Sequence, residues 1–103
     1  MDKKTLNRNI VRALRQVYDP EIPVNIYDLG LIYEIRIDED QKVFIKMTLT
    51  APNCPMADNL VEEVHHAVCD VPGVTGAAIE LTFEPEWDKS RMSDAALLEL
   101  GLL

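Results

Sequence analysis

Cys54 is the residue from which this chain of 103 residues could most directly do chemistry. It stands between Pro52 and Pro55, after a strand-like run and before a helix-like run. Pro55 disfavours helical backbone angles at the residue before it and itself suits the first position of a helix. The pattern therefore predicts that Cys54 caps a helix N-terminus, where unpaired amides and the helix dipole favour a thiolate.

Acidic residues surround Cys54 in the expected fold and limit the chemistry of its thiol. They are Asp19, Glu21, Asp28 and Asp58. Nearby anions oppose ionisation of a thiol, whereas a bound cation would turn the same carboxylates into supporters of a metal–thiolate centre. The surroundings favour a metal-handling cysteine over a bare nucleophile. The alternative is that Cys54 is simply a small buried residue at a turn.

Other chemical constellations are incomplete in this sequence. It has no Ser-His-Asp pattern, no GxGxxG or Walker loop, and no His close to Cys54. His65 and Cys69 have the i,i+4 spacing of a metal-binding pair, but two ligands do not complete a site, so Cys69 receives no role. We therefore expect a protein that is not an enzyme.

The composition excludes several classes of partner. Ten Lys and Arg against eighteen Asp and Glu give a formal net charge of −8, which argues against nucleic acid and against an anionic membrane surface. No apolar run approaches a membrane span, and the N-terminus does not read as a secretory signal. Two cysteines without a CxxC motif indicate free thiols and a cytoplasmic location.

The hydrophobic pattern predicts one domain over residues 1–103 with the order α-β-β-α-β-α. Helical spacing marks residues 3–17 and 55–70, and alternation marks strands over 31–37, 43–50 and 77–84. The first strand is expected to turn Leu31, Tyr33, Ile35 and Ile37 inward, and the third Ile79, Leu81 and Phe83. A short helix over 94–100 begins at the N-cap Ser93 and stops at Gly101.

These elements predict an α+β fold, a three-stranded mixed sheet with helices packed mainly on one face. If the hairpin turn centres near Asp40, paired positions of the first two strands sum to about 80. The third strand follows a helical crossover and should run parallel to the second. The acidic segment 18–30, Cys54 and the exit of the third strand at Trp87 would then meet at one end of the sheet.

Structural readings compete with functional ones for these residues. Asp19 and Glu21 flank Pro20, which is a common turn composition, so shaping the loop is as good an explanation as touching a metal. Asp28 could only cap its loop. Trp87 could be a lid over the core.

Three motifs together resemble one known family, the small metal–sulfur cluster biosynthesis proteins (SufT-like and PaaD-like iron–sulfur assembly domains). The motifs are "DPEIPVNIYDLGLIYEI" (19–35), "TAPNCP" (50–55) and "FEPEWDKSRMSDAALLELG" (83–101). The resemblance places the family's cysteine on Cys54, within the pattern from Thr50 to Pro55, and its acidic motif on Asp19, Glu21 and Asp28. It implies assistance in iron–sulfur cluster formation or delivery to recipient proteins. Because the chain ends without a cysteine-rich C-terminal part, the resemblance favours the SufT-like branch.

The number of thiols limits that implied mechanism. An iron–sulfur cluster usually has four protein ligands, mostly thiolates, and one chain offers a single well-placed sulfur. A cluster or iron ion must therefore be shared between subunits, as in a homodimer, completed by a carrier or client protein or a small thiol, or bound only transiently. A metal-free adapter that binds other assembly proteins is the alternative function, with Trp87 and the acidic face as its contact surface.

Overall fold

The computed structural model describes residues 2–20, 22–50 and 57–102. Its elements are α1 (Lys3–Leu14), β1 (Ile32–Ile37), β2 (Lys42–Met47), α2 (Ala57–Cys69), β3 (Gly76–Leu81), a 3₁₀ turn (Lys89–Arg91) and α3 (Asp94–Glu99). This order confirms the α+β class and the succession α-β-β-α-β-α. In the described ranges no helix is long and apolar enough to cross a membrane.

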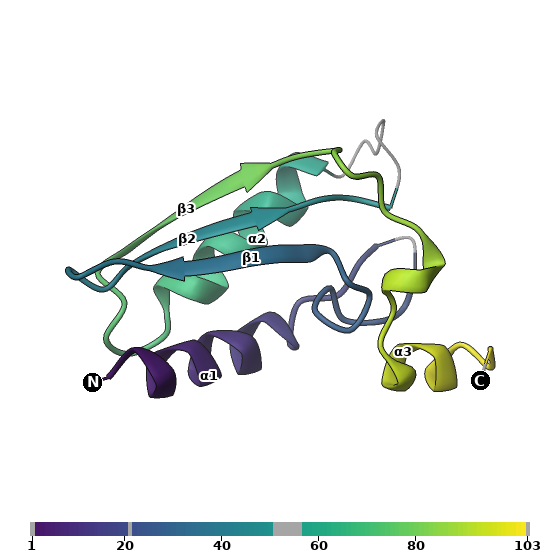
Figure 1. Cartoon of the computed structure of the whole chain (residues 1–103), viewed down its shortest axis with the longest axis horizontal. Helices are drawn as coiled ribbons and strands as arrows, with labels where there is room; N and C mark the ends of the chain where they lie inside the picture. Colours follow the sequence, from purple (N-terminus) through teal and green to yellow (C-terminus); the bar gives the residue numbers. More distant parts are fainter. Residues whose placement is uncertain (1, 21, 51–56, 103) are drawn as a thin grey trace.

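The three strands form one mixed sheet in the order β1-β2-β3 (Figure 1). β1 and β2 are antiparallel, and paired positions sum to 80 from Ile37↔Val43 to Glu34↔Lys46, as predicted. β3 runs parallel to β2, from Lys42↔Gly76 to Met47↔Leu81. Because β2 and β3 run in the same direction, their C-terminal ends lie at the same end of the sheet, and the chain leaves β2 there toward Cys54.

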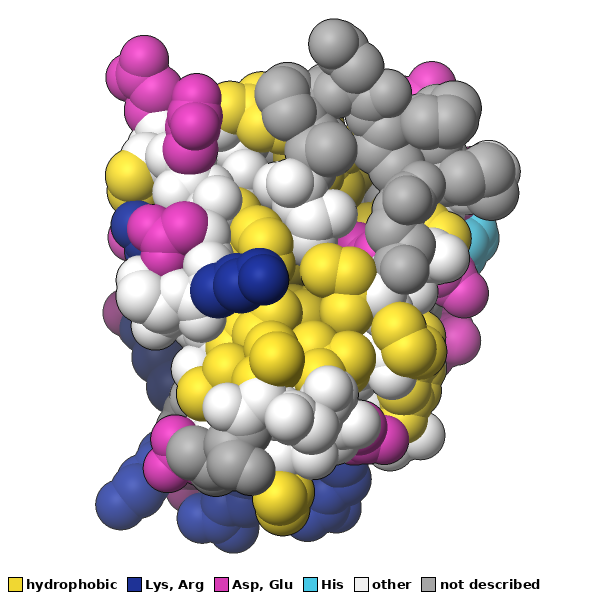
Figure 2. All heavy atoms as spheres, turned by 90° about the vertical axis from the view of Figure 1, so that its right-hand side faces the viewer, with side chains coloured by type: hydrophobic (Ala, Val, Ile, Leu, Met, Phe, Trp, Pro, Cys, Tyr) yellow, Lys and Arg dark blue, Asp and Glu magenta, His cyan; other side chains and the backbone are white. Residues whose placement is uncertain are grey.

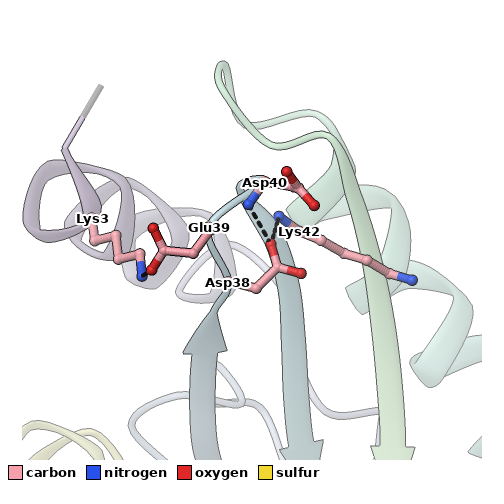
Figure 3. Close-up of polar contacts among 5 residues, drawn as sticks. All are labelled: Lys3, Asp38, Glu39, Asp40 and Lys42. Atoms are coloured by element: carbon pink, nitrogen blue, oxygen red, sulfur yellow. Dashed lines mark hydrogen bonds and ion pairs between the residues drawn. The ribbon is translucent and has the colours of Figure 1, made fainter.

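The β1–β2 turn is fixed by one aspartate and tied to the first helix (Figure 3). Asp38 Oδ1 accepts hydrogen bonds from the backbone N–H groups of Asp40 and Lys42, each at 2.9 Å. Gln41 adopts a positive φ of 64° to close the turn. Lys3 Nζ reaches Glu39 Oε1 at 3.0 Å, so the N-terminus of α1 lies beside the turn.

The core lies between one face of the sheet and helices α1 and α2. Helices α1 and α2 and strand β2 each contribute three buried side chains. These recur with the periodicity of side-chain direction in each element, 3.6 residues in the helices and 2 in the strand. These are Leu6, Ile10 and Leu14 of α1, Val43, Ile45 and Met47 of β2, and Leu60, Val64 and Val68 of α2. On the other face Arg36 is exposed and Phe44 partly exposed, with the guanidinium carbon of Arg36 4.4 Å from the centroid of the Phe44 ring.

Helix α1 ends at Leu14, three residues before the predicted end at residue 17. The expectation was wrong because Val17 is buried at a position that fits the helical period, although its backbone is not part of the helix. Its carbonyl instead accepts a hydrogen bond from the N–H of Ile26 at 2.9 Å. A contact with the following segment therefore replaces the last helical turn.

The strand predictions were correct in position and wrong in three details. A β-bulge between Ile32 and Glu34 interrupts the alternation, so Ile32 rather than Tyr33 is paired with the buried Met47. β2 and β3 stop at Met47 and Leu81, short of residues 50 and 84. Leu81 was expected inside but is 38% exposed, because β3 is the outermost strand of the sheet.

Candidate functional site

The connection between α1 and β1, residues 18–30, is held in place partly by Asp19. We call it the acidic connection. The Asp19 carboxylate accepts a hydrogen bond from the N–H of Ile22 at 3.0 Å, and the side chain is nearly buried. A bridge between Tyr18 and Asn25 closes the segment into a loop. Asp19 thus shapes this loop, as expected for an aspartate before proline.

Asp28 shapes the second half of the acidic connection. Its Oδ2 accepts a hydrogen bond from Asn25 Nδ2 at 2.8 Å, while its own N–H donates to Asn25 Oδ1 at 2.9 Å. Arg15 Nη2 lies 3.8 Å from Asp28 Oδ1, and the Arg15 guanidinium lies over the Tyr27 ring. The Asp28 side chain is only 14% exposed. Asp28 is therefore a nearly buried carboxylate held by a reciprocal pair of hydrogen bonds.

The C-terminal segment, residues 82–93, crosses the sheet end and binds the acidic connection directly. Trp87 Nε1 donates to the carbonyl of Leu29 at 2.6 Å. The N–H of Ser93 donates to the carbonyl of Asp28 at 2.8 Å. Ser93 also caps α3, accepting from the N–H of Ala96 as its sequence position predicted. Two backbone carbonyls of the acidic connection thus receive bonds from the chain's last third.

Gly30 and Tyr33 tighten the same junction. Gly30 has a φ of +82°, and a Cβ placed there would lie 2.2 Å from the carbonyl oxygen of Arg91. Tyr33 donates its hydroxyl to the carbonyl of Pro85 at 2.8 Å, and the Arg91 guanidinium carbon lies 4.6 Å from the centroid of the Tyr33 ring. Only glycine fits this backbone approach without displacement.

The end of β2 lies between these two segments. The N–H of Thr48 donates to the carbonyl of Leu31, directly after the acidic connection, at 2.8 Å. The N–H of Thr82, at the start of the C-terminal segment, donates to the carbonyl of Met47 at 2.8 Å. Thr48 is fully buried, and its hydroxyl has no hydrogen-bond partner among the described residues. Thr50, the last described residue before the range that resumes at Ala57, is half-buried.

The predicted site residues divide into two groups. Asp19, Asp28, Thr50 and Trp87 are described, and hydrogen bonds join the segments that carry Asp28 and Trp87. Glu21, Cys54 and Pro55 lie outside the described residues. Sequence reasoning missed Arg15, which lies beside Asp28. It assigned Tyr33 to the core. The position of this tyrosine three residues after Gly30 could have indicated that it contacts another segment of the chain.

Cys69, the second cysteine, lies on α2 and is partly buried and free. Its sulfur is 3.7 Å from His65 Nε2, as the i,i+4 spacing predicts. In the described ranges no three His, Cys, Asp or Glu side chains gather closely enough to hold a metal ion. Cys69 and His65 therefore remain a pair without further ligands from the described residues.

The 3₁₀ turn that follows Trp87 is stabilised by a charged cap. Asp88 accepts hydrogen bonds from the hydroxyl and the N–H of Ser90. The hydroxyl bond is the main reason that the pKa of Asp88 lies below its ordinary value, and the backbone bond lowers it further. These hydrogen bonds therefore favour the ionised form of the Asp88 carboxyl.

The end of the molecule that carries the junction has an apolar surface at its centre. Figure 2 shows hydrophobic side chains gathered there, with Lys or Arg side chains beside them and acidic side chains toward the margins. The segments at this end include α3 and the C-terminal segment (Figure 1). Their partly or fully exposed apolar side chains include Trp87, Leu97 and Leu98, of which Leu98 is 66% exposed. This surface is suited to contact with another protein.

Comparison with known proteins gives four findings. The family described as "Iron-sulfur cluster assembly protein" matches residues 7–81. A "Fe-S protein maturation auxiliary factor" of Porphyromonas gingivalis is 61% identical over 95 residues, covering 92% of this chain and 90% of that protein. "Fe-S protein maturation auxiliary factor YitW" of Bacillus subtilis is 41% identical over 100 residues, covering 97% and 98%. A crystal structure of a domain of unknown function, DUF59, from Bacillus anthracis superposes with a TM-score of 0.89 at 35% identity, covering 97% of this chain and 95% of that one.

Proposed function

This chain belongs to the iron–sulfur cluster assembly protein family, and we propose that it assists the formation of clusters or their delivery to recipient proteins. The relatives from Porphyromonas gingivalis and Bacillus subtilis are named auxiliary factors of Fe–S protein maturation and match nearly the whole chain. The role proposed is that of a factor which handles a cluster or iron as cargo. It is not that of a catalyst.

The observation that carries this proposal is the junction at one end of the sheet. Trp87 and Ser93 bind the backbone of the acidic connection, and Thr48 at the end of β2 is bonded beside it. Beyond Thr50 the chain continues to Cys54. A rigid scaffold that presents a connecting segment is the usual way in which proteins position reactive groups.

Cys54 is the residue through which we propose that the cargo is held. Its thiolate is the type of ligand that iron–sulfur clusters prefer. A cluster usually needs four ligands, and the described residues supply no group of three candidate ligands that could hold a metal. The cargo would therefore be bound transiently, with its remaining ligands supplied by a carrier, a client protein or a small thiol.

Asp19 and Asp28 have supporting roles in this proposal. Both carboxylates accept hydrogen bonds within the acidic connection, from Ile22 and Asn25 respectively. These bonds shape the connection from within, while Trp87 and Ser93 bind it to the C-terminal segment, so the two aspartates act by positioning. Glu21 is proposed to add negative charge that favours a cation beside the thiolate.

The alternative function is a metal-free adapter, and one observation favours it. The end of the molecule that carries the junction has a central apolar surface (Figure 2). The C-terminal segment and α3 also carry the partly buried Trp87 and the exposed Leu98. An adapter would use this surface to bind assembly proteins without involving a thiol. It predicts that substitutions of Trp87 abolish binding while Cys54 is dispensable.

A cellular test separates the two functions. The chain would be replaced in its host by the variants Cys54→Ser or Cys69→Ser, and the activity of an iron–sulfur-dependent enzyme measured. We expect Cys54→Ser to lower the activity several-fold. Cys69→Ser also removes one thiol and is the matched control, which we expect to leave the activity unchanged. Full activity with Cys54→Ser would reject the thiol-dependent function and leave the adapter.

A further inference from the structure

The outer edge of β3 is not paired with any other strand in the described part of the chain. β3 is the last strand in the order β1-β2-β3, and within the described residues no other strand pairs with its far side (Figure 1). The N–H of Thr82 points toward β2, where it binds the carbonyl of Met47. Because successive backbone groups of a strand point to opposite edges, the N–H groups of Ala77, Ile79 and Leu81 point away from β2.

Proteins usually protect such an edge, and the two edges of this sheet differ in that respect. β1 carries Glu34, Arg36 and a β-bulge, and Tyr33 is tied to the C-terminal segment. β3 has the sequence GAAIEL, with Glu80 as its one charged residue, and keeps an unbroken register with β2. A regular apolar edge without lysine, proline or bulge is open to pairing with another strand.

Apolar surface lies directly beside this open edge. Leu81 is 38% exposed. A hollow of about 660 Å³ separates α2 from the end of β3, and Val61, Ile79 and Leu81 contribute its apolar lining. A strand added to β3 would cover this hollow and remove Leu81 from water, which favours association.

We propose that a second copy of this chain pairs with the edge, β3 to β3 and antiparallel, to form a continuous six-stranded sheet. The sequence of β3 is complementary to itself in one register, in which Ile79 lies opposite Ile79 of the second copy. Leu81 then faces Ala77, so a large side chain meets a small one on the helix-covered face. The outward backbone groups of residues 77, 79 and 81 form about six hydrogen bonds in this register.

The charges agree with the same register. Glu80 lies opposite Ala78 of the second copy, so two glutamates are never directly opposed, and like charges in that position would be destabilising. Glu80 is already partly neutralised by Lys46, at 3.6 Å on β2. The net charge of −8 on each copy opposes association, so added salt should strengthen the dimer.

This dimer is independent of the proposed function. The Cys54 segment follows the C-terminal end of β2, which lies beside the C-terminal end of β3. Antiparallel pairing of two β3 strands sends these ends in opposite directions. The two thiol segments would therefore lie at opposite ends of the dimer, and loss of dimerisation would leave the chemistry of Cys54 untouched.

Analytical ultracentrifugation of the full chain over a wide concentration range tests the proposal. A ladder of five residues is smaller than a standard interface, so we expect a weak dimer with a dissociation constant on the order of 100 µM. Leu81→Lys should raise this constant at least tenfold, because a charge would enter the seam. Leu98→Lys is the matched control on α3 and should leave the constant unchanged, with circular dichroism verifying the fold of both.

A charge pair tests the register itself. Ala78→Lys would place a lysine opposite Glu80 of the second copy and should tighten the dimer about fivefold, whereas Ala78→Glu should weaken it about as much. The same two substitutions at the exposed Ala95 of α3 control for net charge. A chain that stays monomeric up to about 1 mM, or Ala78 variants that behave like the Ala95 variants, would overturn the proposal.

Discussion

The indole N–H of Trp87 donates a hydrogen bond of 2.6 Å to the carbonyl of Leu29, 58 positions away in the chain. This bond joins the exit of β3 to the acidic connection, and Ser93 adds a second bond one residue earlier, at Asp28. The connection between α1 and β1 is therefore not a free loop. It is fixed from outside by the C-terminal segment, at the end of the sheet where β2 leads to Cys54.

Removing the indole donor should weaken this junction. Trp87→Phe keeps an aromatic ring but leaves the Leu29 carbonyl without its partner, and an unsatisfied, partly buried acceptor costs about 1–2 kcal/mol. Tyr33→Phe removes an exposed bond, that to Pro85, and should cost about 0.5 kcal/mol. Urea unfolding of both variants measures the loss in the free energy of unfolding. An equal loss in the two variants would contradict the larger contribution expected of the Trp87 bond.

Gly30 should be far less tolerant of substitution than Gly101. Both have positive φ, 82° and 74°, but a Cβ at Gly30 meets the Arg91 carbonyl, whereas no described residue lies within 4 Å of one at Gly101. Gly101→Ala should cost about 1 kcal/mol from backbone strain alone, and Gly30→Ala about 3 kcal/mol or more. Thermal unfolding compares them. Similar melting temperatures would show that the backbone approach at Gly30 is not as close as the structure has it.

Thr48→Val should stabilise the protein. The Thr48 hydroxyl is fully buried, and no residue in the described part of the chain gives it a hydrogen bond to replace the water it loses on folding. Valine has nearly the same shape and should raise the free energy of unfolding by about 1 kcal/mol. Chemical denaturation checks this value. A loss of stability of the same size would mean that the hydroxyl is in fact bonded.

The Asp88 cap should make stability depend on pH in the acidic range. Hydrogen bonds from Ser90 lower the pKa of Asp88 in the folded state below its ordinary value of 3.8. The contribution is therefore fully present above about pH 4 and is lost as the pH falls through the lower folded pKa. Asp88→Asn should be less stable than the wild type at pH 7, and the difference should shrink below the ordinary pKa. A difference that does not change with pH would exclude the charged cap.

The pattern of side chains was sufficient to predict the layered fold. Strict alternation in β2 and the period of 3.6 in α2 each specify a buried face, and the turn near Asp40 sets the hairpin register. The parallel course of β3 followed from the crossover through α2. These features depend on neighbours in sequence and on general rules of chain connection.

Contacts between distant segments were beyond sequence reasoning. Val17 leaves the helix because Ile26 binds its carbonyl, and Tyr33 leaves the core face because β1 contains a bulge. The pairing of Arg15 with Asp28 depends on where the acidic connection folds back. Convergence of Trp87 with the acidic connection was predicted from topology, but the particular bond to Leu29 was not.

Cys54 remains the central prediction about chemistry, and anaerobic reconstitution tests it directly. The wild-type chain and the variants Cys54→Ser and Cys69→Ser would be incubated with iron and sulfide, separated from unbound metal, and analysed for iron and for the absorption of an iron–sulfur cluster. We predict that the wild type and Cys69→Ser bind iron and that Cys54→Ser does not. Equal iron in all three proteins would contradict the account, because the iron would then be held without the Cys54 thiol.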